Sequence, residues 1–237
     1  MPLLNEAQLH LVGQSEAHVC SAEAADAVGT RMHRDAVAPL LDLREAARQA
    51  GFGLTVLSGF RSFERQLAIW NGKVTGRIPV LDSAGQPLDV ASLSEPELAI
   101  AILRWSALPG ASRHHWGTDV DVFDRWATPP GYEVELTPAE VDADGMFGPL
   151  HDWLDARIAC GESYGFYRPY DADRGGVAPE RWHLSYAPLA AGFSRQLTPA
   201  LLRTALERAD LLLKDTVLQM LPALFDRFVA NTCPAIL

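Results

Sequence analysis

The sequence predicts an α+β protein, in which a small antiparallel sheet is flanked by helices and further helices follow at the C-terminus. Hydrophobic residues make up 48% and charged residues 21% of the 237 residues, which is typical of a globular chain with a buried core. Strand-like and helical segments do not alternate regularly along the chain, as a doubly wound parallel sheet would require. Leucines at helical spacing dominate the end of the sequence and indicate the additional helices.

The N-terminal part predicts a helix, a strand and a second helix. Apolar residues recur at helical intervals over residues 34–50, and Gly51 is placed to end this helix. Residues 52–57 form a short run of β-forming side chains, which predicts a buried strand. The side chain of Ser62 can accept a hydrogen bond from the free N–H groups that begin the next helix.

The middle of the chain predicts a long loop followed by mixed elements. Glycines and prolines over residues 72–93 indicate a loop or an irregular hairpin. Ser94 and Glu97 have the spacing of a capping box, so we expect a helix over residues 95–105. The elements expected after it are a strand at 119–124, a helix at 145–160, an extended piece at 166–170 and a second strand within 174–188.

Leucine spacing from Thr198 onward predicts a helical tail at about residues 198–230, which Pro222 is expected to break or kink. Four basic and four acidic residues make this tail amphipathic without making it cationic. Amphipathic helices usually bury their apolar side against their own protein. We therefore expect the tail to cover the core rather than to bind a partner.

The charge balance and the cysteine count exclude several classes of protein. The 30 Asp and Glu residues outnumber the 20 Lys and Arg residues, so the net charge is -10, and the basic footprint of a nucleic-acid binder is missing. Three dispersed cysteines suit neither a disulfide framework nor a thiolate metal site. No apolar run approaches the roughly 18 residues of a membrane span. The N-terminus lacks a signal-peptide pattern, which predicts a cytoplasmic protein, or a periplasmic or cell-wall protein if a leader was removed or replaced.

Two short polar segments hold candidate metal ligands and a candidate base. The first contains His114 and Asp121, and the second contains Glu180 and His183. Imidazole and carboxylate groups suit zinc, which in catalytic sites takes three protein ligands and leaves a fourth position for water. His114, Asp121 and His183 are therefore candidate ligands, and Glu180 is a candidate base for the proton of that water.

Strand alternation limits this assignment and leaves one choice open. Asp119 and Asp121 would project to one face of the first strand in this region, with the valines on the other face. Alternation alone therefore does not decide which aspartate binds the metal. Glu180 and His183 are three residues apart and would project to opposite faces of a regular strand, so a bend beside Pro179 has to bring them together.

Three motifs, in their order along the chain, resemble those of a known family. SRHHWGTDVD resembles the SxHxxGxAxD signature of the zinc D-Ala-D-Ala carboxypeptidases, the group that includes the vancomycin-resistance D,D-carboxypeptidases. ERWHLSY resembles the ExWHxxY signature of that family, and SGFRSFERQ resembles its upstream SGYRSYxxQ segment. The resemblance covers about residues 34–188.

The resemblance implies one Zn2+ ion per chain, bound by His114, Asp121 and His183, with Glu180 as the catalytic base. It also places Arg61 where the family has an arginine that contacts the substrate and stabilises the charge that develops at the scissile carbonyl. Arginine suits this role because it stays charged and can grip an oxygen pair in a fixed geometry.

Four further residues of the motifs have less specific expectations. Ser112 and Gln66 fall at positions that the resemblance associates with substrate binding or with support of the site. Asp119 stands where the family commonly has alanine; a second carboxylate there can hydrogen-bond a ligating histidine and fix its tautomer, or it can read a positive group on the substrate. His115 has no role in the resemblance and is expected to be a supporting or exposed residue.

The resemblance implies a zinc metallopeptidase of peptidoglycan stem peptides, most directly a D,D-carboxypeptidase that releases terminal D-Ala. The alternatives with the same machinery are an L,D-carboxypeptidase, a cell-wall endopeptidase and a D-Ala-D-Ala dipeptidase; a non-catalytic zinc-containing binding module is the alternative from another class. The expected partner is a stem peptide or a small peptide that contains D-Ala-D-Ala. Because the motifs extend from Arg61 to His183, we expect one domain over residues 1–237, with its motif core at about 34–188.

Overall fold

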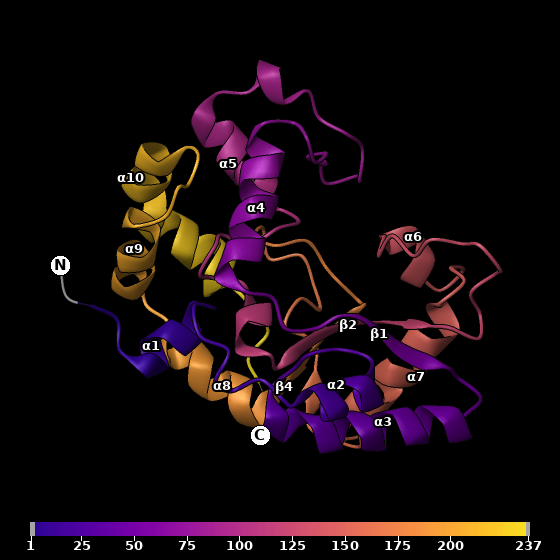
Figure 1. The fold of residues 1–237 in the computed structure, drawn as a ribbon. Coiled ribbons are helices and arrows are strands. Elements are labelled where there is room, and N and C mark those ends of the chain that lie inside the picture. Colours follow the sequence, from indigo (N-terminus) through magenta and orange to yellow (C-terminus); the bar gives the residue numbers. More distant parts are fainter. Residues whose placement is uncertain (1–2, 236–237) are drawn as a thin grey trace.

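The computed structural model describes residues 3–235, and within this range the chain forms a four-stranded antiparallel sheet surrounded by helices (Figure 1). The strand order is β1-β2-β4-β3, and each neighbouring pair is antiparallel. The strands are β1 (Leu54–Ser58), β2 (Asp119–Asp124), β3 (Phe166–Tyr167) and β4 (His183–Tyr186). The predicted α+β fold with a small antiparallel sheet is confirmed.

Ten α-helices lie within the described residues, and two of them begin at the predicted caps. The side chain of Ser62 accepts a backbone hydrogen bond at the start of α4 (Phe63–Val74). Ser94 and Glu97 form a capping box at the start of α5 (Glu95–Leu103). The other helices are α1 (Glu6–Leu11), α2 (Ala22–Val28), α3 (Val37–Gln49), α6 (Pro138–Val141), α7 (Gly148–Ala159), α8 (Ala187–Gln196), α9 (Pro199–Glu207) and α10 (Lys214–Leu224).

One face of the sheet is apolar and the other is polar. Val120 and Val122 of β2 and Leu184 of β4 pack in one core with apolar residues of α3 and α7, which lie together beside the sheet (Figure 1). Asp119 and Asp121 each contact His183, on the side of the sheet away from this core. The predicted alternation of β2 is confirmed, and it leaves the polar face available for a site.

A second core lies between α4, α5 and the C-terminal helices α9 and α10 (Figure 1). Trp70, Ile102, Leu202 and Leu221 are among its buried side chains. The indole N–H of Trp70 also donates to the backbone oxygen of Leu212 at 3.0 Å, which joins α4 to the tail. The C-terminal helices therefore cover an apolar core, as their amphipathic composition predicts.

The tail helix is not broken at Pro222, which was one of the two outcomes that the sequence predicted there. Helix α10 continues through Pro222, and the backbone changes to a π-helical turn only over Phe225–Val229. A proline removes the donor for the carbonyl four residues earlier, which here belongs to Leu218. The guanidinium of Arg203 donates to that carbonyl at 2.7 Å. A side chain of α9 thus replaces the missing hydrogen bond, and the helix does not end there.

Two further observations concern the cysteines and the lengths of the helices. Cys20, Cys160 and Cys233 are free thiols. None of the helices in residues 3–235 is both long and apolar enough to cross a membrane.

Candidate active site

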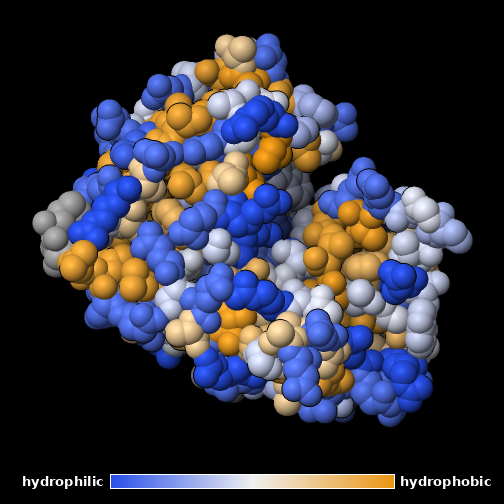
Figure 2. Space-filling view, in the orientation of Figure 1, coloured by the Kyte–Doolittle hydropathy of each residue, from blue (hydrophilic) through white to orange (hydrophobic). Residues whose placement is uncertain are grey.

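A cavity of about 810 Å³ opens between the side of the molecule that carries α4 and α5 and the segment around α6 (Figure 2). Segments far apart in the sequence form its walls: the loop after α4, the segment before β2, the segment before β4 and the π-helical turn of the tail. Arg61, His114 and Glu180, one from each of the three sequence motifs, line the same cavity. The fold therefore brings the motifs to one place.

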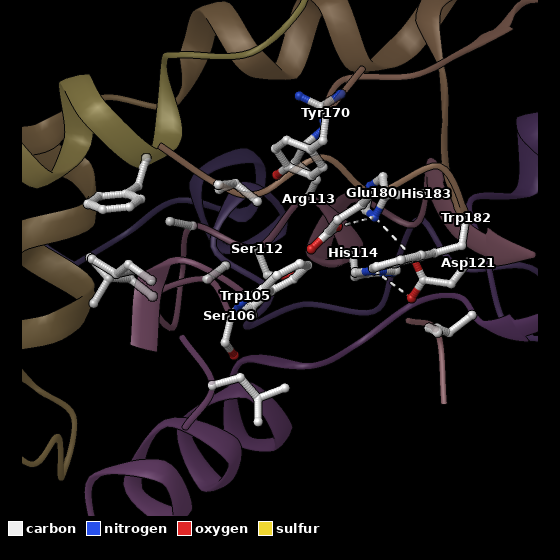
Figure 3. Close-up of a pocket in the computed structure, with 18 of the residues that line it drawn as sticks. Trp105, Ser106, Ser112, Arg113, His114, Asp121, Tyr170, Glu180, Trp182 and His183 are labelled. Carbon is white, nitrogen blue, oxygen red and sulfur yellow. Dashed lines mark ion pairs between the residues drawn. The ribbon is translucent and has the colours of Figure 1, made fainter. Parts of the chain in front are cut away.

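Three candidate metal ligands lie together at the polar face of the sheet (Figure 3). His114 Nε2 is 3.3 Å from Asp121 Oδ2, and His183 Nδ1 is 3.1 Å from Asp121 Oδ1. All three side chains are buried, and one donor atom from each lies within 4.8 Å of the others. Asp121 of β2 and His183 of β4 are direct partners in the antiparallel register, so strand pairing itself sets their separation.

The short turn that carries His114 depends on Gly117. His114 lies in a 3-10 helix (Arg113–Trp116), and Gly117 follows it with φ of +67°, before β2 begins. A Cβ atom on Gly117 would lie 2.6 Å from the backbone nitrogen of His33. Both the left-handed conformation and this close approach require glycine. The glycine of the motif thus fixes the direction of the chain between two ligands.

The hydrogen bonds of His114 and His183 direct one ring nitrogen of each toward Asp121. The carbonyl of Gly59 can only accept, so His114 Nδ1, at 2.9 Å, donates to it and leaves Nε2 unprotonated. His183 Nε2 is 2.9 Å from Asp119 Oδ1, which directs Nδ1 toward Asp121 Oδ1. Asp121 Oδ1 is buried without a hydrogen-bond partner. Two imidazole nitrogens and a carboxylate that face one another in this way fit a zinc ion.

The electrostatics of this cluster also favour a cation. Burial would lower the pKa of His183, but the adjacent carboxylates of Asp119 and Asp121 raise it to about 10. Burial would raise the pKa of Asp121, but the imidazoles of His114 and His183 hold it well below its usual range. The carboxylates thus stay ionised and attract positive charge to this point.

Glu180 lies at the edge of the ligand cluster, in the bend that the sequence required. Strand β4 begins only at His183, whose N–H donates to the carbonyl of Glu180 at 3.0 Å in a turn. This turn brings Glu180 Oε2 to 3.6 Å from His183 Nδ1. Burial raises the pKa of Glu180 to about 8, so this carboxyl group can hold a proton near neutral pH.

Arg61 enters the cavity from the loop between β1 and α4. Its guanidinium donates to Gln66 Oε1 at 3.0 Å and to Ser58 Oγ at 3.1 Å, two neutral acceptors. Gln66 in turn donates to the carbonyl of Ala107 at 2.8 Å and is fully buried. The structure therefore places Gln66 behind Arg61 rather than in the cavity, while Ser112 lines the cavity itself.

Asp119 and His115 lie outside the cavity and support it. Asp119 is fully buried, and its carboxylate accepts hydrogen bonds from Arg113, Thr118 and Ser185 in addition to His183. These donors occupy both of its oxygens, so the position of Asp119 suits a group that orients His183 and not one that reads the substrate. His115 accepts from a backbone N–H through Nε2 and contacts the carbonyl of Arg61 through Nδ1 at 2.7 Å.

Sequence reasoning missed several residues of the site. Arg113 is buried and donates to Asp119 at 2.8 Å, and Tyr170 packs edge-on against His183, with ring centroids 5.1 Å apart. Trp105 and Trp182 form a stacked pair on the cavity wall. Arg113 stands inside a recognised motif, but nothing in its spacing reveals its partner. Trp182 is likewise the tryptophan of the ExWHxxY-like motif, whose spacing does not reveal its stacking on Trp105, and Trp105 and Tyr170 belong to none of the three motifs.

Comparisons with known proteins agree with the motifs. Residues 29–189 match the family model described as VanY, D-alanyl-D-alanine carboxypeptidase. An uncharacterized protein of Haemophilus influenzae is 33% identical over 124 residues, which cover 52% of this chain and 92% of that protein. A D-alanyl-D-alanine carboxypeptidase of Enterococcus faecalis is 29% identical over 158 residues; the match covers 64% of this chain and about half, 47%, of the length of that relative.

Among solved structures, VanYB in complex with D-alanine-D-alanine is similar to this chain. The superposition has a TM-score of 0.49 with 24% sequence identity, and it covers 83% of this chain and 92% of VanYB.

Proposed function

Since the chain belongs to the VanY family of D-alanyl-D-alanine carboxypeptidases, we propose that it is a zinc-dependent enzyme that removes terminal D-Ala from peptidoglycan stem peptides. The family match covers well over half of the chain and confirms the predicted enzyme class, a peptidase of the D-alanyl-D-alanine carboxypeptidase type.

One observation carries the proposal: a buried His–Asp–His cluster and the carboxyl group of Glu180 open into the same cavity as Arg61. A hydrolytic zinc site needs three ligands, a nearby proton acceptor and a donor for the oxygen that gains charge. His114, Asp121 and His183 supply the first requirement, Glu180 the second and Arg61 the third.

The side chains then have complementary tasks in hydrolysis. Zinc bound by the three ligands would supply Lewis acidity for the water and the scissile carbonyl. Glu180 takes a proton from the attacking water and passes it to the leaving amine, a transfer that burial assists because it favours the protonated carboxyl group. Arg61 donates hydrogen bonds to the oxygen that becomes negative. Gln66 and Ser58 hold its guanidinium in place.

The substitution Glu180→Gln tests this proposal directly. It removes the proton acceptor while keeping the size of the side chain, so hydrolysis should fall by at least about a hundredfold, while zinc content stays at that of the wild type. Mass spectrometry of the products from a stem pentapeptide measures hydrolysis, and elemental analysis measures zinc. Glu23→Gln, an exposed position on α2, is the matched control. Full activity of the Glu180→Gln variant would contradict the assigned base.

The same product analysis separates the related activities. A D,D-carboxypeptidase converts the pentapeptide to a tetrapeptide, an L,D-carboxypeptidase shortens the tetrapeptide, and an endopeptidase opens cross-linked muropeptides. A dipeptidase would act on free D-Ala-D-Ala, but the cavity of about 810 Å³ lies in the upper part of the range for ligand pockets and offers more room than two alanines occupy. Cleavage of none of these compounds would favour a binding module.

A further inference from the structure

Tyr170 occupies a position in the cavity that the proposed mechanism does not use. It lies in the segment between β3 and β4, and its backbone oxygen accepts a hydrogen bond from the N–H of Glu180 at 3.0 Å. Its ring packs edge-on against His183, with centroids 5.1 Å apart. Figure 3 shows Tyr170 close to Arg113, Glu180 and His183 at one end of the cavity. The ring therefore stands at the end where the bond would be cleaved.

The hydroxyl group of Tyr170 has no hydrogen-bond partner within residues 3–235. The neighbouring Tyr167 differs, because its hydroxyl accepts a hydrogen bond from Arg113 at 2.9 Å. Tyr170 is only half-buried and lines the cavity, so its hydroxyl can be reached from the cavity. A substrate oxygen in the cavity can therefore accept a hydrogen bond from this hydroxyl without displacing a protein partner.

The hydroxyl of a tyrosine is protonated at neutral pH, because the ordinary pKa of a phenol is about 10. At any pH near neutral the phenol is therefore a neutral donor. It cannot serve as a base beside Glu180, but it can donate a hydrogen bond.

We propose that Tyr170 is a catalytic residue whose hydroxyl donates a hydrogen bond to the substrate oxygen that becomes negative during hydrolysis. The phenol keeps its proton throughout and forms no covalent bond. Arg61 is held by Ser58 and Gln66, whereas Tyr170 packs against His183, so the two donors approach from different segments of the cavity wall. This role rests on the proposed function, because it assigns a second donor to the same reaction.

The substitution Tyr170→Phe removes the hydroxyl and keeps the ring that packs against His183. Loss of one donor to a developing negative charge typically costs about 100–1,000-fold in kcat, and we expect a loss in this range with KM changed less than about threefold. The melting temperature and zinc content should match the wild type. Tyr164→Phe, at an exposed tyrosine just before β3, is the control and should retain full activity. An unchanged kcat, or a loss that resides in KM alone, would overturn the proposal.

A binding measurement keeps this test independent of the proposed reaction. A phosphinate dipeptide carries a tetrahedral, negatively charged group, so Tyr170→Phe should weaken its affinity by about a hundredfold, while the affinity for a product peptide stays the same. If the wild-type protein hydrolyses no stem peptide, the proposed function fails, and the phosphinate affinities still decide the role of Tyr170. A wild-type protein that does not bind the phosphinate, or a variant that binds it equally well, overturns that role.

Discussion

Asp119 and Asp121 are two residues apart on one face of β2, yet their neighbours give them different capacities. Asp121 faces the imidazoles of His114 and His183 and keeps one buried oxygen without a hydrogen bond. Asp119 uses both oxygens for donors, among them the guanidinium of Arg113 at 2.8 Å. Alternation along the strand cannot distinguish these two aspartates, but hydrogen bonding can. Asp121 is free to bind a metal, and Asp119 is placed to hold His183.

We therefore expect Asp119→Asn to weaken zinc binding without removing a ligand. The amide is neutral, so it loses the charge attraction to Arg113 and the charged hydrogen bond that orients His183. Loss of such a supporting carboxylate typically costs about 10–100-fold in metal affinity. Titration against a competing chelator measures the affinity. Asp124→Asn on the same strand is the control, since its amide oxygen can still accept from the N–H groups of Gly53 and Trp126. Wild-type zinc affinity in Asp119→Asn would refute this role.

The site could be predicted from the sequence only where a motif names the residue. His114, Asp121, His183, Glu180 and Arg61 come together as the motifs imply. The partners that hold them come from distant segments and follow no spacing rule. Arg113, for example, donates to Ser185, 72 residues away in sequence, as well as to Asp119. Tyr170 was also beyond prediction, because its role depends on the packing of one ring against His183.

At the scale of elements, the first helix is joined to the site by a cluster of three histidines. His10 of α1 stacks on His18 with ring centroids 3.5 Å apart, and His33 lies 5.6 Å from His18. His18 Nε2 contacts the carbonyl of His115, next to the ligand His114, at 3.1 Å. The sequence did not predict α1 because a helix of six residues has too few apolar positions to show a period.

This cluster predicts a loss of stability in acid. Burial lowers the pKa of His10 to about 4 and of His18 to about 3, and it also lowers the pKa of His33. The negative charge of Glu6 raises the pKa of His10, and that of Asp35 raises the pKa of His33, so both oppose the effect of burial. The positive charge of Arg34 lowers the pKa of His18 and of His33 further. The unfolded chain therefore binds more protons than the folded chain below about pH 6.5, so stability is complete above that pH and declines as the pH falls toward 4.

Thermal unfolding of the wild type and of His18→Gln between pH 7 and pH 4 measures this effect. Each kcal/mol of lost stability lowers the melting temperature by roughly 2–4 °C in a protein of this size, so the wild type should lose several degrees over this range. The variant should lose less, because its amide does not titrate. The difference in pH dependence between the two proteins measures the contribution of the cluster through His18. The buried His151, whose pKa burial also lowers, contributes equally to both proteins and cancels. Identical pH dependence in both proteins would contradict the assignment.

At the scale of the whole molecule, the segment before β2 connects the two cores. Leu108, Ala111 and Trp116 belong to the core beneath the C-terminal helices, while Val120 and Val122 belong to the core beneath the sheet. His114 lies between Ala111 and Trp116 in sequence, so the core beneath the C-terminal helices fixes the metal-binding turn, while the core beneath the sheet fixes β2, which carries Asp121. The net charge of -10 gave no hint of this arrangement, since it is a sum over all charged residues and carries no information on their positions.

This arrangement predicts one cooperative unfolding transition for the whole chain, which is the expectation of a single domain. Leu221→Ala in the tail core and Leu40→Ala in the sheet core each remove a fully buried side chain, and each should cost about 2–5 kcal/mol. Either substitution should lower the denaturation midpoint by the same amount whether unfolding is followed by near-ultraviolet circular dichroism or by loss of bound zinc. The exposed Leu212→Ala is the control and should leave the midpoint nearly unchanged. If Leu221→Ala instead split unfolding into two steps, with zinc retained through the first, the tail would be a separate unit and the single domain would be wrong.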